Sequence, residues 1–274
     1  MSKIITVWGS RGSGKTTFAI RSSLALYRRL REEKRVAVVL ADKCAPAVSY
    51  IFPNFRKEKL RSVGVPLSKP VISRSDVLKN MITVPGKKNY AILGYTDGEN
   101  CYSYPEFSED KIHRFLEVLG EIVDYIIIDC VSDPDDVFTA TALDMCETLF
   151  TVINPDNKSV SWCASSASIA NEYDIKKKCA VVNNVCQDIC LPENSGYRFR
   201  ADIGLIIPYS PEIKVLTNSG KLLNPTGNRL FDKAIANAAS IISDDGDAYY
   251  SDFQDVLEKL DDGRTGHDAG GKAI

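Results

Sequence analysis

Apolar positions in this chain fall into short continuous runs separated by segments with helical spacing. Runs of four to six successive apolar residues are typical of strands that are covered on both faces of a parallel sheet. Residues 15–31 and 110–119 instead repeat apolar positions every three or four residues, as an amphipathic helix does. The alternation predicts an α/β fold, with a doubly wound, mostly parallel sheet of about seven or eight strands and helices on both faces. The expected strands lie at residues 4–8, 36–40, 90–93, 125–129, 149–153, 180–182 and 203–207.

Two stretches interrupt this rhythm. Residues 53–89 contain four prolines and a basic cluster, and we expect short helices and loops there over one edge of the sheet. Residues 184–200 are expected to form a surface excursion. We expect residues 1–242 to form one domain and residues 243–274 to form an acidic, partly disordered C-terminal tail.

Composition places the chain among ordinary globular proteins. Of its 274 residues, 44% are apolar and 26% are charged, and the formal net charge is −2. This charge gives no global reason to expect binding to nucleic acid or to an anionic membrane. No apolar stretch approaches the ~20 residues of a membrane helix, and the eight cysteines contain no C-x-x-C pair. The composition therefore favours a cytoplasmic protein with reduced, buried thiols.

The most specific motif lies at residues 9–16, which read G-S-R-G-S-G-K-T. This is the G-x-x-x-x-G-K-[ST] phosphate loop, and it stands between an expected strand and an expected helix, as the motif requires. Its small residues let backbone N–H groups surround a phosphate at a helix N-terminus. Lys15 can reach the β/γ oxygens, and Thr16 can offer its hydroxyl to Mg²⁺. The motif predicts that the chain binds a nucleoside triphosphate.

Two aspartates follow expected strands and can join the phosphates. Asp129 ends the run Y-I-I-I-D, so its strand delivers a carboxylate to the sheet edge where the loop also lies. It is therefore predicted to take part in binding Mg²⁺ together with Thr16. Asp42 follows the second strand and can orient an attacking water, although an aspartate there is equally typical of a turn or a helix cap.

The order of these segments resembles that of the ParA/MinD superfamily of P-loop ATPases, of the SIMIBI class. The resemblance covers residues 4–242, which would form the ATPase domain. It is carried by the early phosphate loop and by a series of later segments. These segments are V-V-L-A-D (38–42), Y-I-I-I-D (125–129), T-V-I-N-P-D-N-K-S-V (151–160), A-V-V-N-N (180–184) and I-G-L-I-I-P-Y-S-P-E-I (203–213).

The resemblance implies roles for particular residues. Asp42 would belong to switch I and position the catalytic water, and Asp129 would be the Walker B carboxylate. Asn183 would recognise adenine beside the segment at Pro208, since a carboxamide both donates and accepts; taken alone, Asn-Asn is typical of a turn. Lys15, Asp42 and Arg11 are the catalytic candidates. The expected ATP contacts come from Gly9, Ser10, Arg11, Gly12, Ser13, Gly14, Lys15, Thr16, Thr17, Asn183 and Pro208.

One position departs from the family pattern. ParA and MinD proteins carry a signature lysine five residues before the loop lysine, which reaches the partner's phosphates in a sandwich dimer. In this chain that position is Ser10. Arg11 is a long cation next to it, although its backbone place differs and its forked guanidinium is not an ammonium. In this respect the chain is similar to divergent relatives of the TadZ/CpaE kind.

The resemblance favours an ATP-dependent homodimer that hydrolyses slowly and positions pilus, secretion, conjugation or DNA-partition machinery through an unidentified protein partner. A nonhydrolysing scaffold and a small-molecule P-loop kinase or ligase are the alternatives. DNA binding could come from the basic clusters at residues 56–61 and 176–178, but such clusters are more often solvated surface. Direct membrane binding is not expected, because the segment from 244 to 262 is acidic and anionic lipid would repel it.

Overall fold

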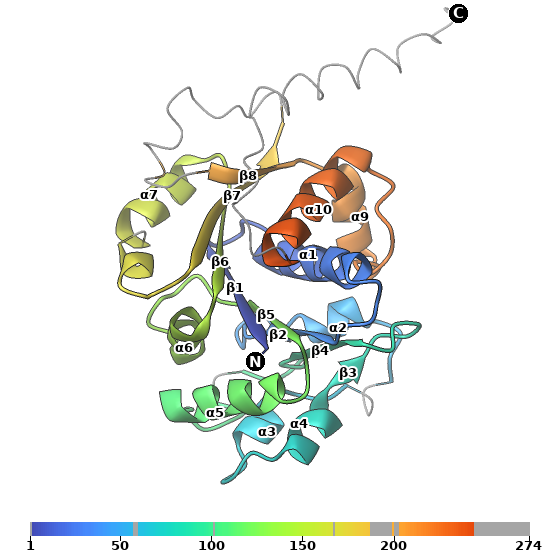
Figure 1. Cartoon of the computed structure of the whole chain (residues 1–274), viewed down its shortest axis with the longest axis vertical. Coiled ribbons are helices and arrows are strands. Elements are labelled where there is room, and N and C mark those ends of the chain that lie inside the picture. Colours follow the sequence, from blue (N-terminus) through green and yellow to red (C-terminus); the bar gives the residue numbers. More distant parts are fainter. Residues whose placement is uncertain are drawn as a thin grey trace, which may run out of the picture.

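One eight-stranded sheet runs through the part of the chain that the structure describes (Figure 1). The structure is a computed structural model, and it describes residues 2–56, 60–100, 102–166, 168–186, 199 and 203–243. The strand order is β3-β4-β2-β5-β1-β6-β7-β8. The strands are β1 (Lys3–Gly9), β2 (Val36–Leu40), β3 (Ile82–Thr83), β4 (Tyr90–Gly94), β5 (Tyr125–Asp129), β6 (Thr148–Ile153), β7 (Lys177–Val185) and β8 (Ile203–Pro208).

All neighbouring strands are parallel except β3, which pairs antiparallel with β4 at the edge. The predicted doubly wound α/β sheet is confirmed. Strands β2 and β5 are buried at every position. Their continuous apolar sequences are required because helices cover both faces of a parallel sheet.

The helices form two layers around this sheet (Figure 1). Helices α1, α2, α9 and α10 share one hydrophobic core with the sheet, and α5 and α6 share a second core with its other face. The helices are α1 (Lys15–Arg29), α2 (Val48–Ile51), α3 (Gly64–Leu67), α4 (Arg74–Asn80), α5 (Glu109–Gly120), α6 (Val137–Met145), α7 (Asn157–Ser166), the 3₁₀ helix η2 (Ile169–Asn171), α9 (Pro211–Asn218) and α10 (Arg229–Ser243).

The stretch 53–89 contains the expected short helices, α3 and α4, and also the edge strand β3. Helix α4 begins at a capping box, in which Ser73 and Asp76 satisfy each other's backbone N–H groups. Most of the expected excursion at 184–200 and the whole tail from 244 lie outside the described residues. Among the helices that the structure describes, none is long and apolar enough to cross a membrane.

Candidate nucleotide-binding site

The topology brings three predicted site elements to one edge of the sheet. Strands β2, β5 and β1 are neighbours and run in parallel, so their carboxyl ends meet. Asp42 follows β2, Asp129 is the last residue of β5, and the phosphate loop follows β1. Beyond β1 the sheet continues with β6, so β1 lies where the strand order reverses. Such switch points are where open α/β sheets bind ligands.

The phosphate loop is shaped by two glycines. Gly9 has φ 149°, and a Cβ there would collide with the carbonyl oxygen of Val152 on β6. Gly14 has φ 88° and caps the N-terminus of α1 without a side-chain hydrogen bond. The first turn of α1 contains no acidic residue, so the positive end of the helix dipole has no carboxylate beside it. The loop therefore presents a helix N-terminus that suits an anion.

The predicted metal residues are in contact with each other. The Thr16 hydroxyl donates to Asp129 Oδ2 at 2.6 Å, and Asp129 exposes 3% of its surface. The pKa of Asp129 is raised to about 7, mainly by burial and to a smaller extent by Asp42, although the Thr16 hydrogen bond and the Lys15 charge lower it. One hydroxyl and one carboxylate fit Mg²⁺, which usually takes few protein ligands beside phosphate oxygens and water.

Lys15 lies folded over the loop. Its ammonium donates to Ser132 Oγ at 2.7 Å, to the Ser10 carbonyl at 3.0 Å and to the Gly9 carbonyl at 3.3 Å. Burial lowers the pKa of Lys15, and the nearby carboxylate of Asp129 partly restores it. These neutral acceptors hold the ammonium more weakly than phosphate oxygens would.

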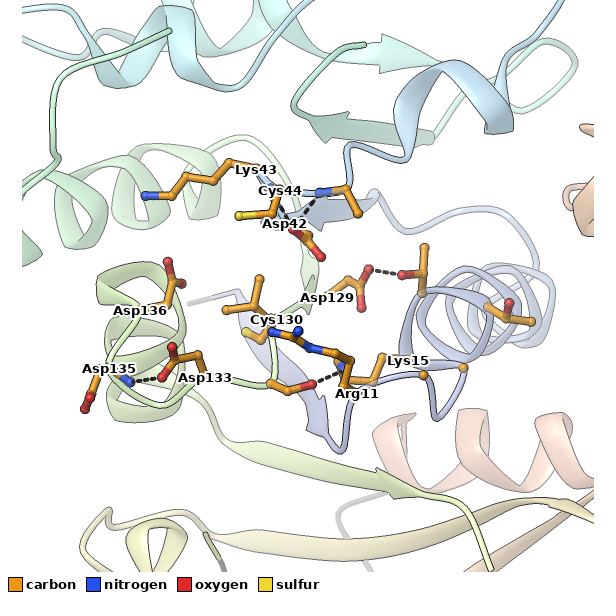
Figure 2. Close-up of a pocket in the computed structure, with 17 residues that line it drawn as sticks. Arg11, Lys15, Asp42, Lys43, Cys44, Asp129, Cys130, Asp133, Asp135 and Asp136 are labelled. Atoms are coloured by element: carbon orange, nitrogen blue, oxygen red, sulfur yellow. Dashed lines mark hydrogen bonds between the residues drawn. The ribbon is translucent and has the colours of Figure 1, made fainter. Parts of the chain in front are cut away.

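Asp42 closes a turn and also lines the cavity. Its Oδ1 accepts hydrogen bonds from the backbone N–H groups of Cys44 at 2.8 Å and Ala45 at 2.9 Å, which closes a turn. It also lines a cavity of about 790 Å³ together with Asp129 and the loop. Figure 2 shows the carboxylates of Asp42 and Asp129 facing this cavity, while the side chain of Lys43 extends away from them.

The cavity wall includes many of the predicted contact residues. Arg11 is exposed on this wall (Figure 2). Predicted residues on the wall are Arg11, Gly12, Gly14, Lys15, Thr16, Thr17, Asp42 and Asp129.

Ser10 and Ser13 are buried in the loop, with 1% and 0% of their surfaces exposed. The Ser10 hydroxyl lies 2.8 Å from the hydroxyl of Ser159, at the start of α7. Asn183 and Pro208 do not line this cavity. The amide nitrogen of Asn183 donates to the Ser13 carbonyl at 2.7 Å.

Several residues of the site were missed by the sequence analysis. Ser132 binds the Lys15 ammonium, and Trp162 Nε1 donates to the Ser132 carbonyl at 3.2 Å. Tyr50 on α2 lies close enough to Asp129 and Thr16 for both to affect its pKa, which burial together with Asp129 raises to about 12. Ser132 follows Asp129 by three residues, which is a signal for a loop near the phosphates. Nothing in the spacing of Tyr50 or Trp162 indicates their contacts.

No protein-family model and no curated protein sequence matches the chain. Its fold is similar to that of a ParA family ATPase from Chlorobium tepidum TLS, with a TM-score of 0.70 at 14% identity over 87% of this chain and 98% of that one. It is also similar to the septum site-determining protein MinD of Pyrococcus horikoshii OT3 in complex with Mg-ADP, with a TM-score of 0.70 at 19% identity over 89% and 96% of the two chains.

A third similar structure is a candidate plasmid partition protein from Borrelia burgdorferi B31 bound to AMPPNP, with a TM-score of 0.68 at 17% identity over 88% of this chain and 98% of that one. In all three cases the likeness extends over nearly the full length of the solved protein. The chain therefore has the fold of the ParA/MinD P-loop ATPases.

Proposed function

We propose that the chain binds Mg²⁺–ATP and works in the cytoplasm as a nucleotide-dependent switch of two subunits, with slow hydrolysis. The observation that carries this proposal is the contact of Thr16 with Asp129 beside a preshaped phosphate loop. Adenine nucleotides are also named in the solved structures of two proteins with this fold, one with Mg-ADP and one with AMPPNP.

The residues of the site divide the work of binding. Backbone N–H groups at the start of α1 and the Lys15 ammonium would hold the phosphates. Thr16 and Asp129 would hold Mg²⁺, which neutralises charge on the phosphate oxygens when it is bound. Asp42 would orient the attacking water, because its Oδ1 is fixed by the turn while the carboxylate faces the cavity.

Two such sites facing each other would repel through their triphosphates. Arg11 and Lys15 are the two cations of the loop at residues 9–16. Lys15 is engaged within its own subunit, whereas Arg11 is exposed on the cavity wall. We propose that Arg11 reaches the phosphates of the partner subunit and takes the place of the signature lysine.

Light scattering on the Asp42→Ala variant tests the switch. With Mg²⁺–ATP this variant is expected to bind nucleotide without hydrolysing it and to form a dimer, and with Mg²⁺–ADP it is expected to stay a monomer. Adding Arg11→Ala should weaken the dimer more than it weakens ATP binding, because the contact is made across the interface. A monomer in the presence of ATP would refute the switch; a dimer unaffected by Arg11→Ala would refute the role of Arg11 alone.

A nonhydrolysing scaffold is the second candidate, and the environment of Ser10 favours it. Its hydroxyl is buried against Ser159, so the position of the signature lysine carries no cation and faces inward. Measuring the release of inorganic phosphate from ATP by the wild-type protein distinguishes the hydrolysing switch from the nonhydrolysing scaffold. Turnover that is lost in Asp42→Ala supports the hydrolysing switch, and no turnover in either protein supports the scaffold.

The work of the switch would be to position other machinery. Solved proteins of this fold include a MinC:MinD cell division complex and candidate or named plasmid partition proteins. We propose a protein partner in pilus, secretion or conjugation machinery, with DNA partition as the other use. Retention on duplex DNA that falls with salt would favour partition, because phosphate contacts release counterions.

A further inference from the structure

Asparagine side chains bind the phosphate loop on its outer side, which is the side turned away from the cavity. Asn183 Nδ2 donates to the Ser13 carbonyl at 2.7 Å, and Asn154 Nδ2 donates to the Gly12 carbonyl at 3.3 Å. Asn154 is itself held, because its Oδ1 accepts from Asn184 Nδ2 at 2.9 Å. A carbonyl oxygen can only accept, so each carboxamide must turn its nitrogen toward the loop.

The contact of Asn183 fixes the direction of one particular amide. In a trans peptide the C=O of one residue and the N–H of the next point in opposite directions. When Asn183 holds the Ser13 carbonyl on the outer side, the N–H of Gly14 is directed to the opposite side, and Gly14 lines the cavity. This N–H lies directly before Lys15, where the loop meets the N-terminus of α1.

The loop and Asn183 are fitted closely to each other. Asn183 exposes 8% of its surface and does not line the cavity. A Cβ at Gly14 would lie 2.5 Å from Asn183 Nδ2, so the approach requires a glycine there. The next residue, Asn184, has φ 60°, a left-handed conformation that asparagine tolerates better than most residues. This backbone lets adjacent asparagines both serve the loop, one directly and one through Asn154.

We propose that Asn183 is a positioning residue for the phosphate loop, acting on the triphosphate of the nucleotide and not on its base. The inference rests on the proposed nucleotide binding and assigns Asn183 a role that differs from the adenine contact implied by the resemblance. One of the two N–H groups of its amide is engaged by the Ser13 carbonyl, and the buried side chain lies outside the cavity that the phosphate loop lines. Affinity for the phosphates then depends on Asn183 whichever base they carry.

Calorimetry with three ligands tests this role: Mg²⁺–ATP, Mg²⁺–GTP and Mg²⁺–tripolyphosphate, which has no base. Asn183→Ala is expected to weaken all three by the same factor, about three- to tenfold, since one buried hydrogen bond to the loop is lost. Asn154→Ala should give the same pattern with a smaller loss, because its bond is longer and less buried. This second variant carries the test if Asn183→Ala does not fold.

Asn89→Ala is the matched control. Its side chain also donates to backbone carbonyls, those of Glu32 and Glu33, but beyond the far end of α1. It is expected to leave all three affinities unchanged. If losing such a hydrogen bond weakened binding only by destabilising the fold, Asn89→Ala would weaken binding as well.

Three results would overturn the inference. Weaker ATP binding with unchanged tripolyphosphate binding would assign Asn183 to the base. Unchanged affinity for all three ligands in both loop variants would remove any role in binding. A wild-type protein that binds none of the three ligands would instead refute the proposed function, and the positioning role with it.

Discussion

Replacing Asp129 by asparagine should stabilise the protein at alkaline pH while abolishing Mg²⁺-dependent nucleotide binding. The carboxyl group is buried at the end of β5, and burial is the main reason why its pKa rises from 3.8 to about 7. Asparagine has nearly the same shape, and its Oδ1 can still accept the hydrogen bond that Thr16 donates. The substitution therefore removes the buried charge and keeps the contact.

The sign follows from proton binding. Between pH 4 and pH 7 the folded protein holds a proton on Asp129 that the unfolded chain has lost, so the free energy of unfolding falls as pH rises through this window and stays low above it. A rise of about three pKa units corresponds to about 4 kcal/mol. Relaxation and water entry around a buried carboxylate reduce this figure, so we expect Asp129→Asn to gain about 2 kcal/mol over the wild type at pH 8.

Urea unfolding at pH 5, 6.5 and 8, without nucleotide or Mg²⁺, measures the difference. The gain of Asp129→Asn should be largest at pH 8 and shrink toward pH 5. Asp136→Asn is the control, since Asp136 lines the same cavity as the N-cap of α6 and asparagine caps a helix equally well. A variant less stable than the wild type at pH 8, or a gain that does not depend on pH, would refute the burial argument.

Two further substitutions test the loop itself. Lys15→Ala should abolish tight Mg²⁺–ATP binding with little loss of stability, because its present acceptors are neutral and its charge serves the phosphates; calorimetry showing unchanged affinity would contradict the phosphate-loop assignment. Ser10→Lys should lower the free energy of unfolding by about 2–4 kcal/mol, since it places a long cation where the Ser10 hydroxyl is buried against Ser159. Chemical denaturation with Ser10→Ala, expected to cost about 1 kcal/mol, separates lost hydrogen bonding from buried charge.

The strands could be predicted where burial on both faces requires a continuous run of apolar residues in the sequence. Strands β2 and β5 are apolar at nearly every position because both faces of the sheet are covered, and their predicted bounds agree with the structure. Strand β3 has two residues and lies at the edge, so no apolar run marks it. Strand β7 is longer than predicted because it continues into polar residues at both ends, Lys177–Lys178 and Asn183–Asn184. Lys177 and Lys178 pair with β6, and the other end runs beside β8. Polar residues of this kind carry no apolar pattern that would predict a strand.

The residues of the site also fall into those that the sequence could predict and those that it could not. The phosphate loop, Thr16 and Asp129 could be predicted because they follow strands whose ends must meet in a parallel sheet. The contacts of Lys15 with Ser132 and of Ser10 with Ser159 join segments 117 and 149 residues apart. Such pairs depend on the register of strands and on the placement of α7, and no local pattern encodes either.

Any mechanism that brings two of these sites together must offset the negative charge of the cavity wall and of the bound phosphates. The cavity wall carries five carboxylates against three cations, before the phosphates of a nucleotide are added. Mg²⁺ neutralises part of that excess at each site, and two sites brought face to face would concentrate what remains in a region of low dielectric constant. Lys15 is held by its own loop and Lys43 extends away from Asp129, which leaves Arg11 as the exposed cation of the loop. In the proposed dimer, Arg11 would therefore supply across the interface the cation that the serine at position 10 cannot supply. Ser10 instead contributes to the support of the loop through Ser159.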